Sequence, residues 1–380
     1  MIELKINPYA GVFKRAKELF ESGYYSEAFS KLSIIIENDK DNFIANYYVA
    51  ECYFNGKGVE KNYDLAFMNY SLAADKKHLG SIYMLGYCFE FSLGTYKDDI
   101  QMISRYTNAA KSGHTLAQYR LGLCYKNGKG VEQSVSVASS YFLKAAKSGL
   151  VEAQREAGIC FEMMNQPTAS ATLFLAAAEQ KDPYSCFKIG NFYEVGYGCE
   201  QKYELAMHFY ITAATLGNED AILTIARKYK TGEGLEKSIS SAINWWNKVI
   251  DTSVEAELEV AKCLLTGNGI AKDINKGMNL LKKAASKKDK EACVLLAKIS
   301  LGTKTEEEVK EYISWLLKAA EYGSGEAMHL LGVYHEEKQN IKECYRWFNM
   351  AINEEYEPSM EAIKKYKKTL LGTIRQRKNA

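Results

Sequence analysis

Pairs of small apolar residues recur along this chain at nearly constant intervals. From the first residue of one pair to that of the next, the steps are 36, 36, 32, 36, 36, 35, 35 and 32 residues. The pairs are Ala73-Ala74, Ala109-Ala110, Ala145-Ala146, Ala177-Ala178, Ala213-Ala214, Val249-Ile250, Ala284-Ala285, Ala319-Ala320 and Ala351-Ile352, with a looser Ile35-Ile36 before them. Such a period is typical of a repeat array, in which each unit packs only on its neighbours.

Other apolar positions keep the same register, and their spacing predicts two amphipathic helices in each repeat. A large residue precedes the pair by three positions, as at Tyr70, Tyr106 and Tyr210. A small residue follows about seven positions later, and then comes an apolar–small pair such as Leu85-Gly86. Spacings of three, four and seven residues place side chains on one face of a helix. Gly or Ala where two helices cross leaves room for an aromatic ring of the neighbour.

Glycine-rich segments predict the turns within the hairpins. The sequence Asn-Gly-Lys-Gly-Val occurs at residues 55–59 and again at 127–131, and Gly-x-Gly recurs at 196–198, 232–234 and 267–269. Glycine accepts positive φ, so it can end the first helix and turn the chain back. The 32-residue repeats lack this loop, and one of them begins its second helix at Gln166-Pro167, where proline is tolerated.

This combination of positions resembles the Sel1-like repeat, a relative of the TPR. The family pattern, Tyr/Phe-x2-Ala-Ala, a small residue, Leu-Gly-x2-Tyr and Gly-x-Gly-Val, covers residues 41–359, and residues 9–40 are more similar to a plain TPR hairpin. We expect residues 360–372 to form an amphipathic capping helix and residues 373–380 to form a basic flexible tail. The resemblance implies an all-α fold, a right-handed superhelical α-solenoid of about ten hairpins.

The charge is nearly balanced overall but uneven along the chain. The formal net charge is +2, whereas residues 361–380 hold seven bases and one acid. We interpret the basic segment 364–378 as a solvated helix face and a frayed terminus, so nucleic acid is not an expected partner. No stretch has the ~18 to 20 apolar residues that span a bilayer, and the start lacks the apolar core of a signal peptide. We expect a cytoplasmic protein without a membrane partner.

Nine cysteines raise the question of disulfides or metal. Cys52, Cys88, Cys124 and Cys160 are 36 residues apart, and Cys263 has the same place in a later repeat. Equivalent positions of adjacent repeats should lie ~10 Å apart. A disulfide needs Cα atoms within ~7 Å, and zinc needs sulfur at ~2.3 Å. We predict buried, unpaired thiols in a reducing compartment. The histidines also lack metal-ligand spacing, so neither a metal nor a cofactor is expected.

Two fragments are similar to motifs of penicillin-binding serine hydrolases. Ser185 and Lys188 share a helix face, and Lys230-Thr231-Gly232 matches a second motif. The sequence has no Ser-Asp-Asn element, and the Lys-Thr-Gly piece falls in a repeat loop rather than on a strand. Matches this short arise by chance. We therefore assign no catalytic residue and expect a protein that is not an enzyme.

Two rows of first-helix residues are candidates for a binding surface, because in TPR-type solenoids the first helix of each hairpin lines the concave side. Row 1 lies two residues before the Leu of each Leu-Gly pair and comprises Tyr47, Tyr83, Tyr119, Arg155, Phe187, Leu223, Leu258, Val294 and His329. Row 2 lies two residues after it and comprises Glu51, Tyr87, Leu123, Ile159, Asn191, Arg227, Lys262, Lys298 and Val333. Tyr and Arg are frequent at binding hot spots.

From these rows we predict partner contacts by Tyr47, Tyr83, Tyr87, Tyr119, Arg155, Asn191, Arg227 and Lys262. The tyrosines are expected to form one patch that anchors the partner, because Tyr47, Tyr83 and Tyr119 are 36 residues apart. The alternative, that these rings simply pack between repeats, stays open.

The resemblance implies an intracellular scaffold or adaptor that binds a partner protein in its concave groove and is monomeric when free. Another function of the same class is an immunity-type protein that neutralises a toxin. The competing class is a serine hydrolase acting through Ser185 and Lys188, which a reactive serine probe would detect. The partner has no signature in the sequence, because repeat surfaces carry no portable motif.

Overall fold

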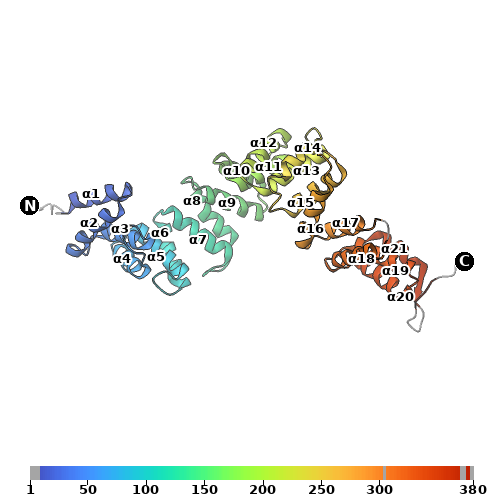
Figure 1. Ribbon diagram of the computed structural model, residues 1–380. Helices are drawn as coiled ribbons and strands as arrows, with labels where there is room; N and C mark the ends of the chain where they lie inside the picture. The colour runs from blue at the N-terminus through green and yellow to red at the C-terminus, as the bar shows by residue number, and fades with distance from the viewer. Residues whose placement is uncertain (1–8, 303–304, 369–373, 377–380) are drawn as a thin grey trace, which may run out of the picture. The chain divides into compact units, whose positions relative to one another are not determined.

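The structure is a computed structural model that describes residues 9–302, 305–368 and 374–376. It comprises two compact units, Met1–Leu216 (unit 1) and Gly217–Ala380 (unit 2). Within each unit, consecutive helices pack against each other as hairpins in chain order (Figure 1). The predicted α-solenoid of helical hairpins is confirmed. In the described part of the chain, strands occur only in one short hairpin.

Unit 1 consists of helices that alternate between the first and the second member of a hairpin. They are α1 (Ala10–Glu21), α2 (Tyr25–Asn38), α3 (Phe43–Asn55), α4 (Tyr63–Asp75), α5 (Leu79–Phe91), α6 (Asp99–Lys111), α7 (Thr115–Asn127), α8 (Val135–Ala146), α9 (Val151–Met163), α10 (Pro167–Glu179), α11 (Pro183–Val195) and α12 (Tyr203–Thr215).

Unit 2 continues the alternation and ends in a different element. Its helices are α13 (Glu219–Thr231), α14 (Ile239–Trp246), α15 (Val254–Thr266), α16 (Ile274–Ser286), α17 (Lys290–Ser300), α18 (Glu306–Glu321), α19 (Gly325–Glu337), α20 (Ile341–Asn353) and α21 (Glu357–Ala362). A short 3₁₀ turn (Ile363–Lys365) leads to the antiparallel strands β1 (Tyr366–Lys368) and β2 (Ile374–Gln376).

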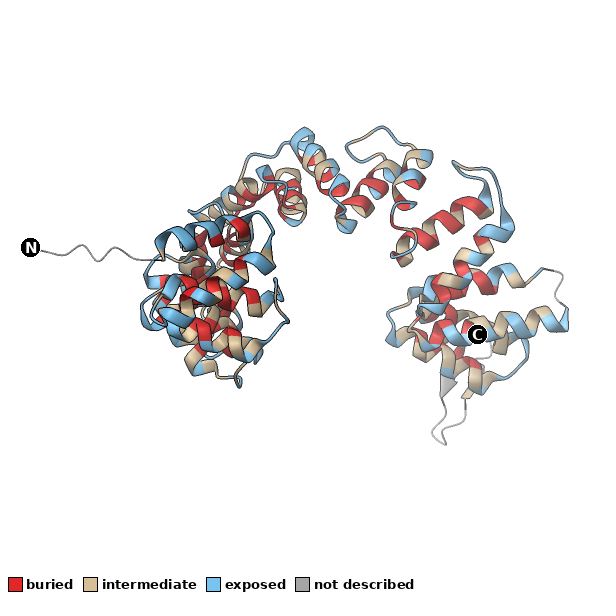
Figure 2. Ribbon diagram, turned by 60° about the vertical axis from the view of Figure 1, so that its left-hand side comes forward, coloured by how far each residue is buried: buried red, intermediate tan, exposed pale blue. Residues whose placement is uncertain are grey.

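Several hairpins close around one large ring that lies against a small residue, and Leu281 and Leu316 take the place of the ring in two hairpins of unit 2. A Cβ atom added at Gly86 would lie 2.7 Å from the ring of Tyr106, and one added at Gly122 would lie 2.6 Å from the ring of Phe142. Contacts this short exclude any side chain at these two positions. The ring therefore requires the glycine of the Leu-Gly pair. These rings and the alanine pairs form the buried core that runs along each unit (Figure 2).

The glycine loops both turn the chain and dock it on the preceding hairpin. Gly56 ends α3 in the left-handed conformation, with φ +71°. Gly58, with φ +74°, lies so near α2 that a Cβ atom would be 2.3 Å from the backbone carbon of Tyr25. The second glycine is therefore required by packing as well as by its dihedral angle.

Helix α14 is shorter than the other second helices and ends at Trp246. The repeat has Val249-Ile250 in place of the alanine pair that continues the second helix elsewhere. Branched side chains lose rotamer freedom in a helix and crowd its neighbour. The chain instead passes through turns at 247–252 before α15 begins.

The capping helix predicted over residues 360–372 is wrong in the described residues. Helix α21 ends at Ala362, and Tyr366–Lys368 pairs with Ile374–Gln376 as a β hairpin, so part of the predicted flexible tail is a strand. A helix through Lys364, Lys365 and their lysine neighbours would set like charges three and four residues apart, which is unfavourable. Tyr366 instead covers the last apolar face, packing with Phe348. Residues 369–373 and 377–380 lie outside the described residues.

Candidate partner-binding site

Two row 1 tyrosines link their hairpin to the next one through histidine rings. Tyr47 on α3 lies 4.4 Å from His78, ring centre to ring centre, and Tyr83 on α5 stacks on His114 at 4.8 Å. Burial is the main cause that raises the pKa of Tyr47 to about 12, and it also raises the pKa of Tyr83. These tyrosines therefore stay uncharged at neutral pH.

The two histidines also cap the helices that follow them. His78 precedes α5, and its Nδ1 accepts a hydrogen bond from the backbone N–H of Ser81 at 3.2 Å. His114 precedes α7, and its Nδ1 accepts from the N–H of Ala117 at 3.2 Å. Burial lowers the pKa of both imidazoles, which keeps Nδ1 available as an acceptor.

Other row 1 residues also contact the start of the next hairpin. Arg155 pairs with Asp182, the residue that caps α11, at 2.5 Å. In unit 2, His329 lies 5.4 Å from Tyr356, the residue before α21, between ring centres. These row 1 residues therefore hold successive repeats together.

An aromatic cluster extends row 2 in unit 1, and we define it as Phe54, Tyr83, Tyr87 and Phe91 with Arg120. The ring of Tyr87 lies 4.6 Å from Phe91, 6.1 Å from Phe54 and 6.5 Å from Tyr83. The guanidinium of Arg120 lies over Tyr87 at 5.2 Å and over Phe91 at 5.6 Å. Phe91 is 45% exposed, so this cluster presents an aromatic surface to solvent.

The predicted tyrosine patch is only partly joined by direct ring contacts. Tyr83 and Tyr87 are neighbours, and Tyr47 reaches them through Tyr70 and Phe54. Tyr119 instead packs on Phe142 of its own hairpin, at 5.8 Å. Which of these tyrosines contact a partner stays a prediction.

Sequence reasoning missed Phe91, although a signal was present. Phe91 takes the position of Asn55 and Asn127 in the neighbouring repeats, and the loop after it has lost the regular pattern. Ser92, which follows it, adopts a positive φ of 57° where the two neighbouring repeats have Gly56 and Gly128. The loss of the repeat pattern around Phe91 is therefore the signal that the sequence offers.

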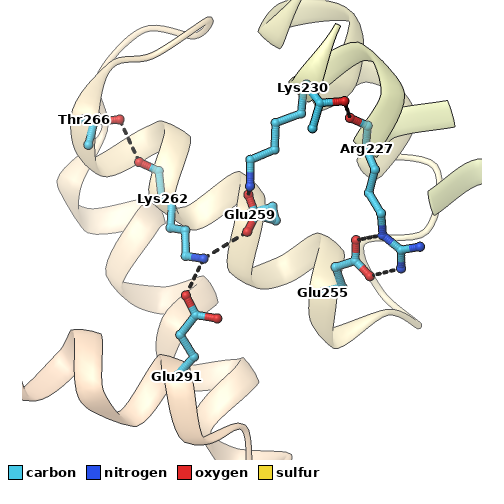
Figure 3. A network of polar contacts seen from close by, with 8 residues as sticks. Arg227, Lys230, Glu255, Glu259, Lys262, Thr266 and Glu291 are labelled. Carbon is cyan, nitrogen blue, oxygen red and sulfur yellow. Dashed lines mark hydrogen bonds and ion pairs between the residues drawn. The ribbon is translucent and has the colours of Figure 1, made fainter. Parts of the chain in front are cut away.

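In unit 2, three residues of row 2 are cations that pair with acids at the start of the next first helix. Lys262 lies 2.6 Å from Glu291 and 2.9 Å from Glu259, and Arg227 pairs with Glu255 (Figure 3). Lys298 repeats the arrangement with Glu326 at 2.7 Å. Glu255, Glu291 and Glu326 lie in the first turn of their helices, where the helix dipole favours negative charge. We call these pairs, with Lys230–Glu259 at 2.6 Å, the ionic ladder.

Asn191, a row 2 residue of unit 1, contacts its own hairpin rather than the next one. Its side-chain oxygen accepts a hydrogen bond from the Tyr210 hydroxyl at 2.7 Å, and Glu194 accepts from the same hydroxyl. Burial is the largest cause that raises the pKa of Tyr210. Asn191 therefore supports the core ring of its hairpin.

A further set of complementary charges joins first helices within unit 1. The sign of the charge changes from one junction to the next: Glu90–Arg120 (3.7 Å), Lys126–Glu156 (2.6 Å) and Glu162–Lys188 (2.8 Å). A junction formed between the wrong repeats would bring like charges together, so this alternation favours the correct neighbour.

The residues of the serine-hydrolase alternative have structural partners. Ser185 is fully buried, and its hydroxyl donates to Asp182 at 2.7 Å. Lys188 pairs with Glu162, and Gly232 ends α13 with positive φ. A buried serine that is tied to a helix cap is not presented to a substrate.

All nine cysteines lie within the described residues and are free thiols. Burial raises the pKa of Cys52, Cys88 and Cys124 to about 12 and that of Cys160 to about 11. Such thiols are unreactive at neutral pH. Among the residues with described positions, no group of three or more His, Cys, Asp or Glu side chains could hold a metal ion. No helix there is long and apolar enough to cross a membrane.

Helical hairpins that are joined through their first helices define a TPR-like α-solenoid, a class of repeat protein with an extended binding surface. The Sel1 repeat model matches residues 44–78, 80–102, 115–150, 183–218, 225–250, 254–289 and 325–356, more than half of the chain. The chain therefore belongs to the Sel1 repeat family. Proteins of this family are typically non-enzymatic scaffolds for protein–protein interaction.

Solved structures share the fold. The protective antigen c5321 of uropathogenic Escherichia coli, which displays an SLR fold, aligns with a TM-score of 0.77 and 22% identity over 92% of this chain and 81% of that chain. A Sel1 repeat protein from Oxalobacter formigenes aligns with a TM-score of 0.55 and 23% identity over 63% of this chain and 96% of that chain. No curated protein matches the sequence.

Proposed function

We propose that this chain is a scaffold or adaptor that captures a partner protein on the aromatic cluster of unit 1. One observation carries the proposal. Phe91 is 45% exposed and lies beside Tyr87 and Arg120 at a position where neighbouring repeats have asparagine. Aromatic residues and arginine dominate binding hot spots, since they offer large contact areas at a small entropic cost.

The cluster is also preorganised for binding. The guanidinium of Arg120 is held over the rings and pairs with Glu90. Glu90 also pairs with Lys129, at 3.0 Å. Lys129 also lies over Phe91 at 5.5 Å. Side chains that are already ordered lose little entropy when a partner binds.

The remaining predicted contacts would extend this surface. In the proposal, Tyr47, Tyr119, Arg155 and Asn191 flank the cluster in unit 1, while Arg227 and Lys262 belong to a second, weaker contact region. Their contacts within and between hairpins support a rigid platform rather than an adaptable one.

The proposed setting is a monomer in the reducing cytoplasm, which nine unpaired thiols support. Thiol titration of the denatured protein without reductant should find nine reactive groups. Recovery of five or fewer would contradict this setting.

The binding proposal is tested by quantitative capture from lysate with the wild type, Phe91→Ala and a matched control. Leu72→Ala is suitable as the control, because Leu72 is 41% exposed on the second helix α4 and lies outside the cluster. We expect a protein that the wild type and Leu72→Ala retain and Phe91→Ala loses. Equal retention by all three would contradict the proposal. If the retained protein is a toxin that this chain inhibits, the immunity-type alternative is the correct one.

A further inference from the structure

The glycine loop of a hairpin docks on the start of the second helix of the hairpin before it. A Cβ atom added at Gly130 would lie 3.1 Å from Asp99 and from Ile103 of α6. These two residues stand seven and three positions before the core ring of Tyr106. In other loops the second glycine also meets the residue seven positions before the core side chain: Gly58 on Tyr25, Gly94 on Tyr63, Gly198 on Pro167 and Gly269 on Ile239.

Helix α18 offers the same docking place, but the next hairpin lacks the loop that would occupy it. Val309 and Ile313 stand seven and three positions before the core side chain of α18, which is Leu316. The next hairpin, α19–α20, is one of the shortened repeats. Its helices are joined by only three residues, Lys338-Gln339-Asn340, which include no glycine.

A cavity of about 560 Å³ lies at this place. Its walls come from α18 and from the end of α19: Glu306, Val309, Lys310, Ile313, Tyr334 and Lys338. Tyr334 stands three positions after the Leu of its Leu-Gly pair, where Cys88 and Cys124 stand in their repeats. The cavity therefore takes the place of a missing loop, with an aliphatic floor and an aromatic wall.

The other shortened repeat, α9–α10, does not combine these side chains. Ser139 of α8 takes the place of Ile313 and is buried. Cys160 of α9 takes the place of Tyr334. Of the two shortened repeats, only α19–α20 therefore has both the aliphatic floor and the aromatic wall.

The rim of the cavity carries a cation that is open to a ligand. Lys310 pairs with Glu306 at 2.7 Å, so these two charges balance. Lys338 is exposed, and its ammonium lies over the ring of Tyr334 at 5.9 Å. Lys338 has no ion pair with a described residue. An aliphatic group with a carboxylate beside it therefore complements the cavity.

We propose that this cavity binds a loop of a partner protein with the sequence Gly-x-Gly-aliphatic-Glu. The loops of the chain itself are the template, since an aliphatic residue and then Glu follow the second glycine at residues 58–60, 130–132 and 234–236. The second glycine would approach the backbone of α18 at Val309, as Gly58 approaches that of α2. The aliphatic side chain would pack on Ile313 and Tyr334, and the glutamate would pair with Lys338.

The occupant is assigned to another protein because loops of this chain are used within it, as those of Gly58 and Gly130 are docked on their own chain. A second copy of the chain is the alternative source of such a loop. The site lies wholly in unit 2. It does not rest on the aromatic cluster, so the failure of either proposal leaves the other intact.

The test is methyl NMR of the full chain labelled at its Ile and Val side chains, with signals assigned from Val309→Ala and Ile313→Val. The probe is the peptide acetyl-Asn-Gly-Lys-Gly-Val-Glu-Lys-amide, which copies residues 55–61. One control peptide has alanine in place of the second glycine, and another has glutamine in place of the glutamate. We expect a saturable shift of the Val309 and Ile313 signals. Binding should be about tenfold weaker for the alanine peptide, which a Cβ atom would keep from the helix backbone, and about threefold weaker for the glutamine peptide.

The outcomes separate the sources and can overturn the proposal. Unchanged Val309 and Ile313 signals, or equal binding of the alanine peptide, overturn the site. Sedimentation velocity of the chain alone tests the second copy. Self-association that the peptide suppresses would overturn the assignment to another protein, and a monomer supports it.

Restoring the missing loop gives a test within the chain. In the graft, residues 338–340 are replaced by the seven residues of 128–134, which join α7 and α8. The grafted loop should occupy the cavity. The peptide should therefore bind about tenfold more weakly to this graft than to the same graft with alanine in place of its second glycine. Equal affinities of the two grafts overturn the assigned place, and circular dichroism confirms that both are folded.

A matched pair of variants tests the assigned lysine. Lys338→Gln removes the cation at the rim, so the affinity for the peptide should fall about threefold. Lys282→Gln is the control, because Lys282 is exposed on α16 and is not part of the cavity wall. Equal affinities of the two variants would contradict the pairing of the glutamate with Lys338.

Discussion

First-helix residues join successive hairpins by different chemistry in the two units. In unit 1, row 1 tyrosines contact a ring at the start of the next hairpin, as Tyr83 contacts His114. In unit 2, row 2 cations contact an acid at the start of the next hairpin, as Lys262 contacts Glu291. The geometry of the repeat fixes which residues meet across a junction, and the chemistry of the contact is free to vary.

This difference changes what each surface offers to a partner. Aromatic contacts leave ring faces and edges that can still pack against a partner. Salt does not screen these contacts, because they do not depend on net charge. The ionic ladder satisfies each charge internally, and its exposed pairs contribute little to stability. We therefore assign the main binding energy to unit 1 and not to the ladder.

The largest expected effect comes from a core ring of unit 1. Tyr106→Ala removes a fully buried ring that Gly86 accommodates, and it leaves Glu90 without its hydroxyl partner. We expect the free energy of unfolding to fall by ~3–5 kcal/mol, measured by urea denaturation followed by circular dichroism. Arg227→Ala in the ladder is the control, with an expected loss below ~1 kcal/mol. Similar losses for the two variants would contradict the contrast between rings and ion pairs.

A smaller effect is expected from reversing a charge at a junction of unit 1. Lys126→Glu places two carboxylates together, because Lys126 lies 2.6 Å from Glu156 and both side chains are mostly buried. The loss should be ~1–3 kcal/mol, and Lys126→Glu/Glu156→Lys should recover most of it. If the double variant is no more stable than the single one, the alternating charges do not select neighbours.

The features that could be predicted from the sequence are those whose residues lie close together along the chain. The hairpins, the glycine turns and the fit of rings on Leu-Gly pairs follow from spacings within one repeat. The partners across junctions do not, because Tyr83 and His114 are 31 positions apart and meet only once the repeats are stacked. His78 and His114 are 36 positions apart, but a spacing alone does not distinguish a helix cap from a solvated loop residue.

Local exceptions were the least predictable. Helix α14 ends at Trp246 because of Val249-Ile250. The substitution is evident in the sequence, but the early end of the helix is not. The β hairpin at the end of unit 2 depends on Tyr366 finding the Glu336 carboxylate at 2.7 Å, a tertiary contact. Phe91 was not predicted because the repeat was recognised from the positions that its copies share. Phe91 stands at a position where its repeat differs from the neighbouring ones.

Acid should weaken unit 1 through its capping histidines. The folded pKa of His78 and of His114 lies below the ordinary value of 6.5, so the native state binds fewer protons than the unfolded state just below that pH. The stability they contribute is therefore present above about pH 6.5 and is lost as the pH falls from there towards the folded pKa. Each cap is worth ~0.5–2 kcal/mol.

The check is urea denaturation at pH 7.5 and 5.5 for the wild type and for His78→Asn/His114→Asn, which keeps a capping acceptor without the titration. The variant should lose less stability than the wild type between the two pH values. His329 in unit 2 also has a pKa lowered by burial and remains in both proteins, so it cancels in the comparison. An equal loss in both would show that the caps do not titrate.

The smallest effect concerns salt. A double-mutant cycle on Arg227 and Glu255 should give a coupling of ~0.2–1 kcal/mol in low salt, and screening should reduce it at 1 M salt. The Tyr83–His114 contact should keep its coupling in both conditions, because it does not depend on charge. A ladder coupling that survives high salt would contradict the assignment of a purely ionic link.

The central claim is that unit 1 carries the binding energy and the ladder does not. The direct measurement is the affinity of the captured partner for Phe91→Ala and for Arg227→Ala, by isothermal titration calorimetry at fixed salt. We predict that Phe91→Ala weakens binding by about thirtyfold, or ~2 kcal/mol, and that Arg227→Ala changes it by less than about threefold. Wild-type affinity for Phe91→Ala together with a thirtyfold loss for Arg227→Ala would contradict the account.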